Sequence, residues 1–216
     1  MSARGSLPGA VLLALLLAVG CTPQAPVNHG VYMLLDTSGT YRQELDKAQQ
    51  IIRYTLSRLD AADSFAVARI DTGSFSEKDI VAKTTLDDRP STMNRQKRQF
   101  AETVGRFVEA TQSSPYTDIS GGLLQAVEFL NEKDTGRKTV LIFSDLKEDL
   151  EDGYVRDVPF ELAGFDVIAL NVTKLRSDNV DPNEYLGRLG EWRRRVEAAG
   201  GNFRVINDLD GLEGML

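Results

Sequence analysis

The sequence predicts an α/β protein with a doubly wound, mostly parallel sheet and one antiparallel edge strand. Apolar runs of strand length alternate along the chain with longer segments in which apolar residues recur at helical spacing. The two clearest runs, Val31–Leu35 and Lys138–Phe143, are continuous, which is typical of parallel strands that are buried on both faces. Each of them leads into an aspartate, Asp36 and Asp145 respectively.

The size and charge of the chain restrict the class of protein. With 216 residues, it is long enough for one domain with a substantial core and too short for two comfortable ones. Hydrophobic residues make up 42% and charged residues 26%, as in ordinary folded proteins. The net charge is −7, and phosphate binding needs a concentrated basic face, so we expect no nucleic-acid partner. The sequence leaves the oligomeric state open.

Residues 1–20 have the features of a secretory signal peptide. Arg4 supplies a positive charge, and the apolar run Val11–Val19 is too short to span a bilayer as a stable helix. The segment ends at Cys21, the only cysteine, and resembles a bacterial lipobox with Ala18 where leucine is commoner. The resemblance implies that Cys21 carries a lipid. The alternative is an ordinary cleaved signal followed by an incidental cysteine.

Residues 21–30 are expected to form the lipidated cysteine and a short proline-rich tether, so that the folded domain covers residues 31–216. The only histidine, His29, falls in this tether and is therefore a poor candidate for a metal ligand or a catalytic group. Thr22 follows the cysteine, and by the sorting rule for many Gram-negative lipoproteins this favours the outer membrane. We expect a lipid-anchored protein of the bacterial cell envelope.

The first half of the domain contains three predicted strands and two predicted helices. After Val31–Leu35, a helix is predicted over Tyr41–Leu59, where apolar residues recur every three or four positions. Ser64–Ile70 is a second apolar strand. Asp79–Leu86 is more polar and follows closely, so we expect these two strands to pair antiparallel at an edge of the sheet. A long amphipathic helix is predicted over Met93–Ala110.

The second half continues the alternation. A helix over Ile119–Asn131 leads into the buried strand Lys138–Phe143, and Phe165–Leu170 is predicted as the next strand. An amphipathic helix is predicted over Asn183–Ala199, before two glycines that favour a helix end. Phe203–Ile206 is predicted as the last strand.

Two charged segments of the second half are interpreted as surface. The acidic run Glu148–Asp152 is expected to form a solvated loop or the first turn of a helix. On the last helix, we expect Trp192 to be a partly buried aromatic residue and Arg193–Arg195 to form a solvated basic face.

Oxygen-bearing side chains gather at the predicted ends of the strands. In doubly wound sheets, ligands bind beyond the carboxyl ends of the strands where the strand order reverses, so Asp36 and Asp145 are expected to face one crevice. Ser38 and Thr40 follow Asp36 at alternate positions, and Thr117 precedes the next helix. Without a usable histidine or a free cysteine, these oxygens favour a hard cation, Mg²⁺ first and Mn²⁺ or Ca²⁺ next, over zinc.

Three motifs in this order resemble the von Willebrand factor type A (vWA) family and its metal-ion-dependent adhesion site. Asp36–Thr40 (DTSGT) matches the family motif Asp-x-Ser-x-Ser, with threonine as the last residue. Thr117 matches the family threonine. Asp145 matches the aspartate of the third loop, although Leu146 stands where glycine usually follows. The resemblance extends from about Gly30 to Ile206.

The resemblance implies a Rossmann-like vWA fold and a protein that binds a partner. By the family pattern, Ser38 and Thr40 would contact the metal directly, and Thr117 would join them when ligand is bound. Asp36 and Asp145 would act largely through water. A carboxylate from an Asp or Glu of a partner protein would then complete the coordination of the metal.

An enzyme is one alternative to this function. The DTSGT segment also resembles the Asp-x-Asp-x-Thr motif of haloacid dehalogenase-like phosphatases, which use Mg²⁺ and a nucleophilic aspartate. Their second aspartate, the general acid, is Ser38 here, and its loss lowers the rate on the order of 10²–10⁴-fold. The remaining phosphatase motifs are matched only loosely, by Lys138 or Lys147 and by Asp178 or Asp181.

Purely structural roles are the other alternative. A scaffold with a vestigial metal site would bind its partners without a metal. In that case Asp36 and Ser38 merely close a turn, and Thr117 or Asp118 merely caps a helix. Asp145 would cap the segment that follows it.

Overall fold

The computed structural model describes residues 27–39, 44–72, 76–154, 156, 158–172, 182–207 and 210–213. The strands are β1 (His29–Leu35), β2 (Ser64–Arg69), β3 (Ile80–Thr85), β4 (Arg137–Phe143), β5 (Phe165–Leu170) and β6 (Asn202–Ile206). The helices are α1 (Leu45–Arg58), α2 (Pro90–Ala110), α3 (Ile119–Glu132) and α4 (Pro182–Ala198), with short 3₁₀ helices η3 (Glu77–Asp79) and η5 (Asp210–Leu212).

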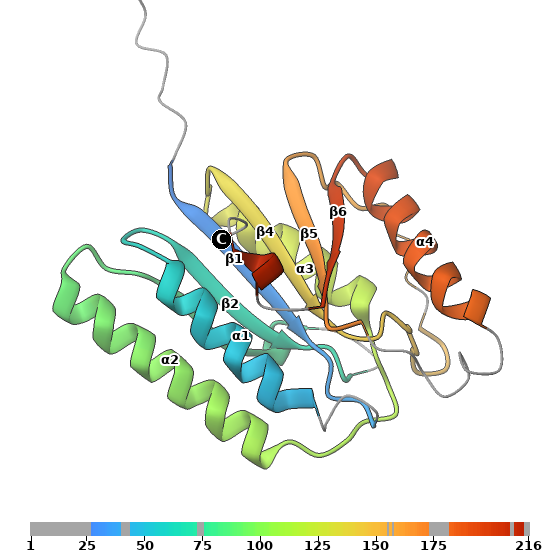
Figure 1. The fold of residues 1–216 in the computed structure, drawn as a ribbon, viewed down its shortest axis with the longest axis horizontal. Coiled ribbons are helices and arrows are strands. Elements are labelled where there is room, and N and C mark those ends of the chain that lie inside the picture. Colours follow the sequence, from blue (N-terminus) through green and yellow to red (C-terminus); the bar gives the residue numbers. More distant parts are fainter. Residues whose placement is uncertain are drawn as a thin grey trace, which may run out of the picture.

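The six strands form one sheet in the order β3-β2-β1-β4-β5-β6 (Figure 1). All neighbouring strands are parallel except β2 and β3, which pair antiparallel at the edge. The predicted fold class and its single antiparallel edge strand are therefore confirmed. The strand order reverses between β1 and β4, and the carboxyl ends of these two strands border the crevice where doubly wound sheets bind ligands.

Helices cover both faces of the sheet, with α1 and α2 in front and α3 behind it in Figure 1. Successive residues of β1 point to opposite faces, because side chains alternate along a strand. Val31, Met33 and Leu35 pack in the core that α1 and α2 cover. Tyr32 and Leu34 pack in the core that α3 and α4 cover. This double burial accounts for the unbroken apolar run in the sequence.

Strand β1 begins two residues earlier than the sequence predicts, and His29 is not a tether residue. Its side chain is only 8% exposed. Its backbone N–H donates to Asp63 Oδ1 at 2.6 Å, and its Nε2 lies 2.8 Å from Thr139 Oγ1. The prediction placed this polar residue outside the fold because its partners lie on segments distant in the sequence. In the described ranges, no helix is long and apolar enough to cross a membrane.

Candidate metal site

The site begins at the carboxyl end of β1 with Asp36, which is fully buried. Its Oδ1 accepts a hydrogen bond from the backbone N–H of Ser38 at 2.8 Å. Its Oδ2 accepts one from the hydroxyl of Ser144 at 2.7 Å. Asp36 therefore closes its own turn, as the structural alternative expects, and it also joins the first loop to the loop that follows β4.

The loop after β4 is held by short-range hydrogen bonds. The backbone N–H of Leu146 donates to Ser144 Oγ at 3.1 Å, and that of Lys147 donates to Asp145 Oδ1 at 2.8 Å. Leu146 has φ +65°, in the left-handed region that favours glycine, and its side chain is only 2% exposed. The leucine that replaces the usual glycine thus adopts the conformation that glycine would favour.

The third segment of the site is the loop before α3, which is paired with the loop after β4. The backbones of Thr117 and Asp149 exchange two hydrogen bonds, at 2.7 and 2.9 Å. Ser38 and Ser114 form an isolated parallel bridge, so all three loops are connected. Asp118 is the N-cap of α3, because its Oδ1 accepts from the backbone N–H of Gly121 at 2.7 Å.

An open pocket of about 430 Å³, here called the strand-end pocket, lies between these loops. Its lining consists of Ser38, Gly39, Ser113, Ser114, Pro115, Thr117, Asp145, Lys147 and Asp149. Three of the predicted ligands, Ser38, Thr117 and Asp145, are therefore brought together on one surface. Asp36 is buried beside this pocket and is not part of the lining. Thr40, the remaining predicted ligand, and Cys21, the predicted lipidation site, lie outside the described residues.

The electrostatics of the pocket favour a cation. Burial raises the pKa of Asp145 to about 6, and the neighbouring Asp36 carboxylate adds to this rise against the opposing hydrogen bond from the Lys147 backbone. Burial also raises the pKa of Asp36, although hydrogen bonds from Ser144 and Ser38 oppose the rise. A bound cation would stabilise the charged form of both carboxylates against this burial. Hydroxyl and carboxylate oxygens are ligands of hard cations, so these residues fit Mg²⁺, Mn²⁺ or Ca²⁺.

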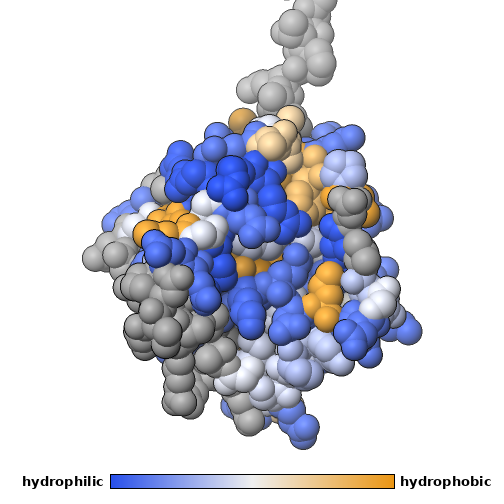
Figure 2. Space-filling view, turned by 90° about the vertical axis from the view of Figure 1, so that its right-hand side faces the viewer, coloured by the Kyte–Doolittle hydropathy of each residue, from blue (hydrophilic) through white to orange (hydrophobic). Residues whose placement is uncertain are grey.

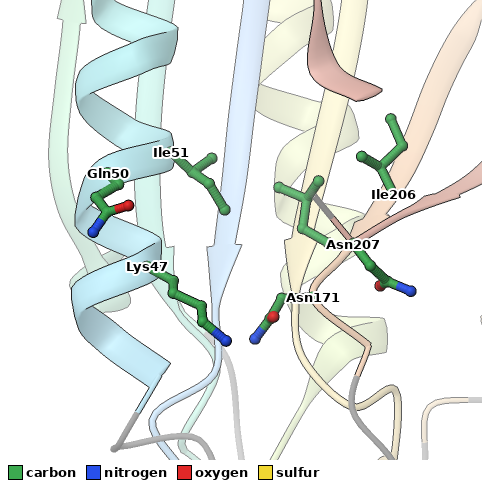
Figure 3. Close-up of a pocket in the computed structure, with 7 residues that line it drawn as sticks. Lys47, Gln50, Ile51, Asn171, Ile206 and Asn207 are labelled. Carbon is green, nitrogen blue, oxygen red and sulfur yellow. The ribbon is translucent and has the colours of Figure 1, made fainter. Parts of the chain in front are cut away.

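Hydroxyl groups are essential to any such site. Among the residues that the structure describes, no three His, Cys, Asp or Glu side chains gather in a way that would hold a metal ion. A second cavity, of about 200 Å³, lies between α1 and the ends of β5 and β6 (Figure 3). It is lined by the polar residues Lys47, Gln50, Asn171 and Asn207 together with apolar residues, and Lys47 points toward Asn171. Unlike the lining of the strand-end pocket, this lining has no carboxylate or hydroxyl group.

Comparison with known proteins identifies the fold. The sequence matches no protein-family model and no curated protein significantly. Solved structures of other proteins resemble the chain in three dimensions, among them the following two. A von Willebrand factor type A protein from Catenulispora acidiphila has a TM-score of 0.58 at 19% identity, over 87% of this chain and 40% of its own. The pilus adhesin SpaC from Lactobacillus rhamnosus GG, in an open conformation, has a TM-score of 0.56 at 10% identity, over 89% of this chain and 29% of its own.

This chain has the von Willebrand factor type A fold. It spans less than half the length of either similar structure. The vWA fold predicted from the motifs is thereby confirmed.

Several residues around the site of this vWA fold were not anticipated. Ser144 links Asp36 to the backbone of Leu146, and its position directly before Asp145 at a strand end was the only available signal. Glu148, expected to be solvated, accepts hydrogen bonds from the backbone N–H and the hydroxyl of Ser120, at 2.6 and 3.0 Å.

The pairing of Asp118 with Arg156 also could not be predicted. Arg156 donates three hydrogen bonds to the Asp118 carboxylate, which is fully buried, and the shortest is 2.6 Å. The two residues are 38 positions apart, so no local pattern connects them.

Two expectations for α4 of the vWA fold were wrong. Trp192 is fully rather than partly buried, with 2% of its surface exposed. The Arg193–Arg195 run is not uniformly solvated, because the Arg195 side chain turns inward and its guanidinium lies 4.2 Å from the ring centroid of Trp192. Arg193 behaves as expected, since about half of its side chain is exposed.

Proposed function

We propose that this chain is a lipid-anchored envelope protein that binds a divalent cation and, through it, an acidic group of a partner protein. Mg²⁺ is the first choice, with Mn²⁺ or Ca²⁺ next. The observation that supports this proposal is the convergence of Ser38, Thr117 and Asp145 on the strand-end pocket beside the buried Asp36. The likeness in fold to a pilus adhesin agrees with a binding role at the cell surface.

The side chains around the strand-end pocket would have different roles in binding. Ser38, Thr117 and Asp145 would hold the cation, with Thr40 beside Ser38 in the motif, while Asp36 orients the first loop through the Ser38 backbone. The bound cation supplies an electrophilic centre for an incoming carboxylate, because few direct carboxylates neutralise it. A pocket of about 430 Å³ has room for a hydrated ion and a partner side chain, since one water occupies about 30 Å³.

The amino end of β1 and the strand-end pocket lie at opposite ends of this strand. His29 begins this strand and Asp36 follows its carboxyl end, so about 23 Å of extended chain separates them. A lipid on Cys21 would place the amino ends of the strands nearer the membrane. The pocket would then face away from the membrane, where a partner protein can reach it.

The metal proposal is tested by isothermal titration calorimetry with Mg²⁺ and Mn²⁺. The protein used lacks residues 1–20 and carries the substitution Cys21→Ser. We expect Asp145→Asn to weaken binding by at least about tenfold, because it removes a ligand charge. Asp149→Asn is the matched control, since it makes the same charge change in the same pocket at a side chain with no predicted ligand role. Equal losses in both variants, or no binding by the parent protein, would contradict the proposal.

Anchoring and catalysis are tested separately. Cys21→Ser should release the full-length protein from the membrane fraction, and unchanged fractionation would refute lipidation.

For the phosphatase alternative, Lys138 lies at the start of β4, at the other end of the sheet from the pocket, where its Nζ donates to Asn131 Oδ1 at 2.6 Å. Hydrolysis of a generic phosphate ester that is lost in Asp36→Ala would nevertheless favour an enzyme over a binding protein.

A further inference from the structure

Three residues of α4 form a stripe that contacts the loops of the candidate metal site. Arg188, Trp192 and Arg195 are separated by four and three positions, so they share one face of the helix. The molecular face that carries α4 is mostly hydrophilic, with hydrophobic residues only in small separate areas (Figure 2). Because Trp192 is buried, the side of α4 that carries this stripe faces the core of the domain.

Each residue of this stripe binds the segment after β4 at a different point. Arg188 Nε donates to the carbonyl of Asp145 at 3.2 Å. Trp192 Nε1 donates to the carbonyl of Leu146 at 3.0 Å. The Arg195 guanidinium lies 3.5 Å from the Glu148 carboxylate and donates to Ser120 Oγ at 2.6 Å. The stripe thus holds consecutive parts of the loop that carries Asp145, and it also reaches the first turn of α3.

The loop needs such support because its backbone is strained. Leu146 has a left-handed backbone, which is unfavourable for a residue with a side chain. The buried carbonyl of Leu146 accepts a hydrogen bond from the indole of Trp192. Removal of this donor would destabilise the loop, because loss of the partner of a buried carbonyl is unfavourable. Trp192 is itself fixed between the core and the guanidinium of Arg195.

We propose that Arg188, Trp192 and Arg195 are positioning residues for the metal site. They hold the backbone carbonyls of Asp145 and Leu146 and the side chain of Glu148, so that the Asp145 carboxylate lines the strand-end pocket. This inference rests on the proposed function. It adds that α4, which contributes no residue to the lining of the pocket, controls the cation affinity of the pocket through its contacts with the loop after β4.

The first test measures the loop without any metal. Amide hydrogen exchange is followed in the metal-free Cys21→Ser protein lacking residues 1–20, and in its Trp192→Phe variant, which keeps an aromatic ring and loses the Nε1 donor. We expect exchange at Leu146 and Lys147 to accelerate by about tenfold or more, with β1 and β4 unchanged. Phe203→Leu is the control, because it weakens the same core from β6, which is separated from β4 by β5. Arg188→Met provides a second, half-buried probe if Trp192→Phe folds poorly.

The second test measures Mg²⁺ affinity in the same proteins. Trp192→Phe should weaken the Mg²⁺ affinity by about 10-fold or more, as expected for a residue that orients a metal ligand without contacting the metal. Phe203→Leu should not weaken it. Unchanged loop exchange in both Trp192→Phe and Arg188→Met would overturn the inference. Equal affinity losses in Trp192→Phe and Phe203→Leu would also overturn it. A parent protein that binds no Mg²⁺ would instead overturn the proposed function, whatever the exchange of the loop.

Discussion

At the scale of single residues, the backbone and the side chain of Leu146 favour different amino acids. Its backbone is left-handed, with φ +65°, which opposes any residue other than glycine. Its side chain is buried in the core on the α3 and α4 side, which favours a large apolar residue. Burial of a leucine side chain stabilises the fold by about 1.5–3 kcal/mol, which offsets the cost of about 1–2 kcal/mol for the left-handed backbone. The loop after β4 therefore keeps its shape without glycine.

Substitutions at Leu146 separate the strain of its backbone from the burial of its side chain. Leu146→Ala should lose about 2–5 kcal/mol in the free energy of unfolding, because it removes a buried side chain and keeps the strain. Leu146→Gly should be more stable than Leu146→Ala by roughly 0.5–1 kcal/mol, since it relieves the strain at some cost in chain entropy. Urea unfolding of the metal-free proteins measures both values. An alanine variant at least as stable as the glycine variant would mean that Leu146 is not strained.

At the scale of elements, the approach of α3 to the sheet places the second loop of the site. Helix α3 begins directly after Thr117 and Asp118, and its first turn packs closely against β1 and the end of β2. A Cβ atom on Gly122 would lie 2.7 Å from Ile70 Cγ2 and 2.8 Å from Leu34 Cδ2. The small residue is therefore required for the helix to approach this closely, which in turn brings Thr117 to the strand-end pocket.

Gly122→Ala should consequently destabilise the protein although alanine favours helices. We expect a loss of about 1–3 kcal/mol from overpacking. Gly105→Ala in α2 is the matched control, because a Cβ there meets nothing within 4 Å, and it should stabilise the protein by up to about 1 kcal/mol. Thermal and urea unfolding of the two variants compare these effects. Similar changes in both variants would show that α3 can move away from the sheet at little cost.

At the scale of the whole molecule, the two ends of the sheet have different roles. The carboxyl ends of β1 and β4 carry the candidate metal site. At the amino ends, His29 joins β1 to Asp63 before β2 and to Thr139 on β4. Burial, with a further contribution from the nearby charge of Arg137, lowers the pKa of His29 to about 4. This histidine is therefore a neutral structural group at physiological pH.

The buried His29 predicts a loss of stability in mild acid. Its pKa is lower in the folded chain than its ordinary value of 6.5, so the unfolded chain binds the extra proton between about pH 6.5 and pH 4. The stability is complete above pH 6.5 and should fall by up to about 3 kcal/mol as the pH falls to 4. Urea unfolding at pH 7 and pH 4.5 should show a smaller difference for His29→Gln than for the parent protein. Equal differences would mean that His29 titrates normally.

The sequence by itself determined the order of the elements, the parallel sheet and most of the candidate site. Hydrophobic periodicity is a local property, and it identifies strands and helices without knowledge of their neighbours. The carboxyl ends of parallel strands lie on one edge of the sheet, so aspartates directly after β1 and β4 had to meet there. For this reason the shared location of Asp36, Ser38, Thr117 and Asp145 was predictable.

Only the tertiary structure decided how the site is held in place. Trp192 and Leu146 are 46 positions apart, and no periodic pattern connects an indole on a helix with the carbonyl of a strained loop. His29 looked like part of a polar tether because its partners, Asp63 and Thr139, come from other segments of the chain. Contacts of this kind depend on the packing of whole elements, whereas local patterns specify only which elements form. The packing of the elements therefore determines which contacts hold the candidate metal site in place, whereas the local sequence determines which side chains form it.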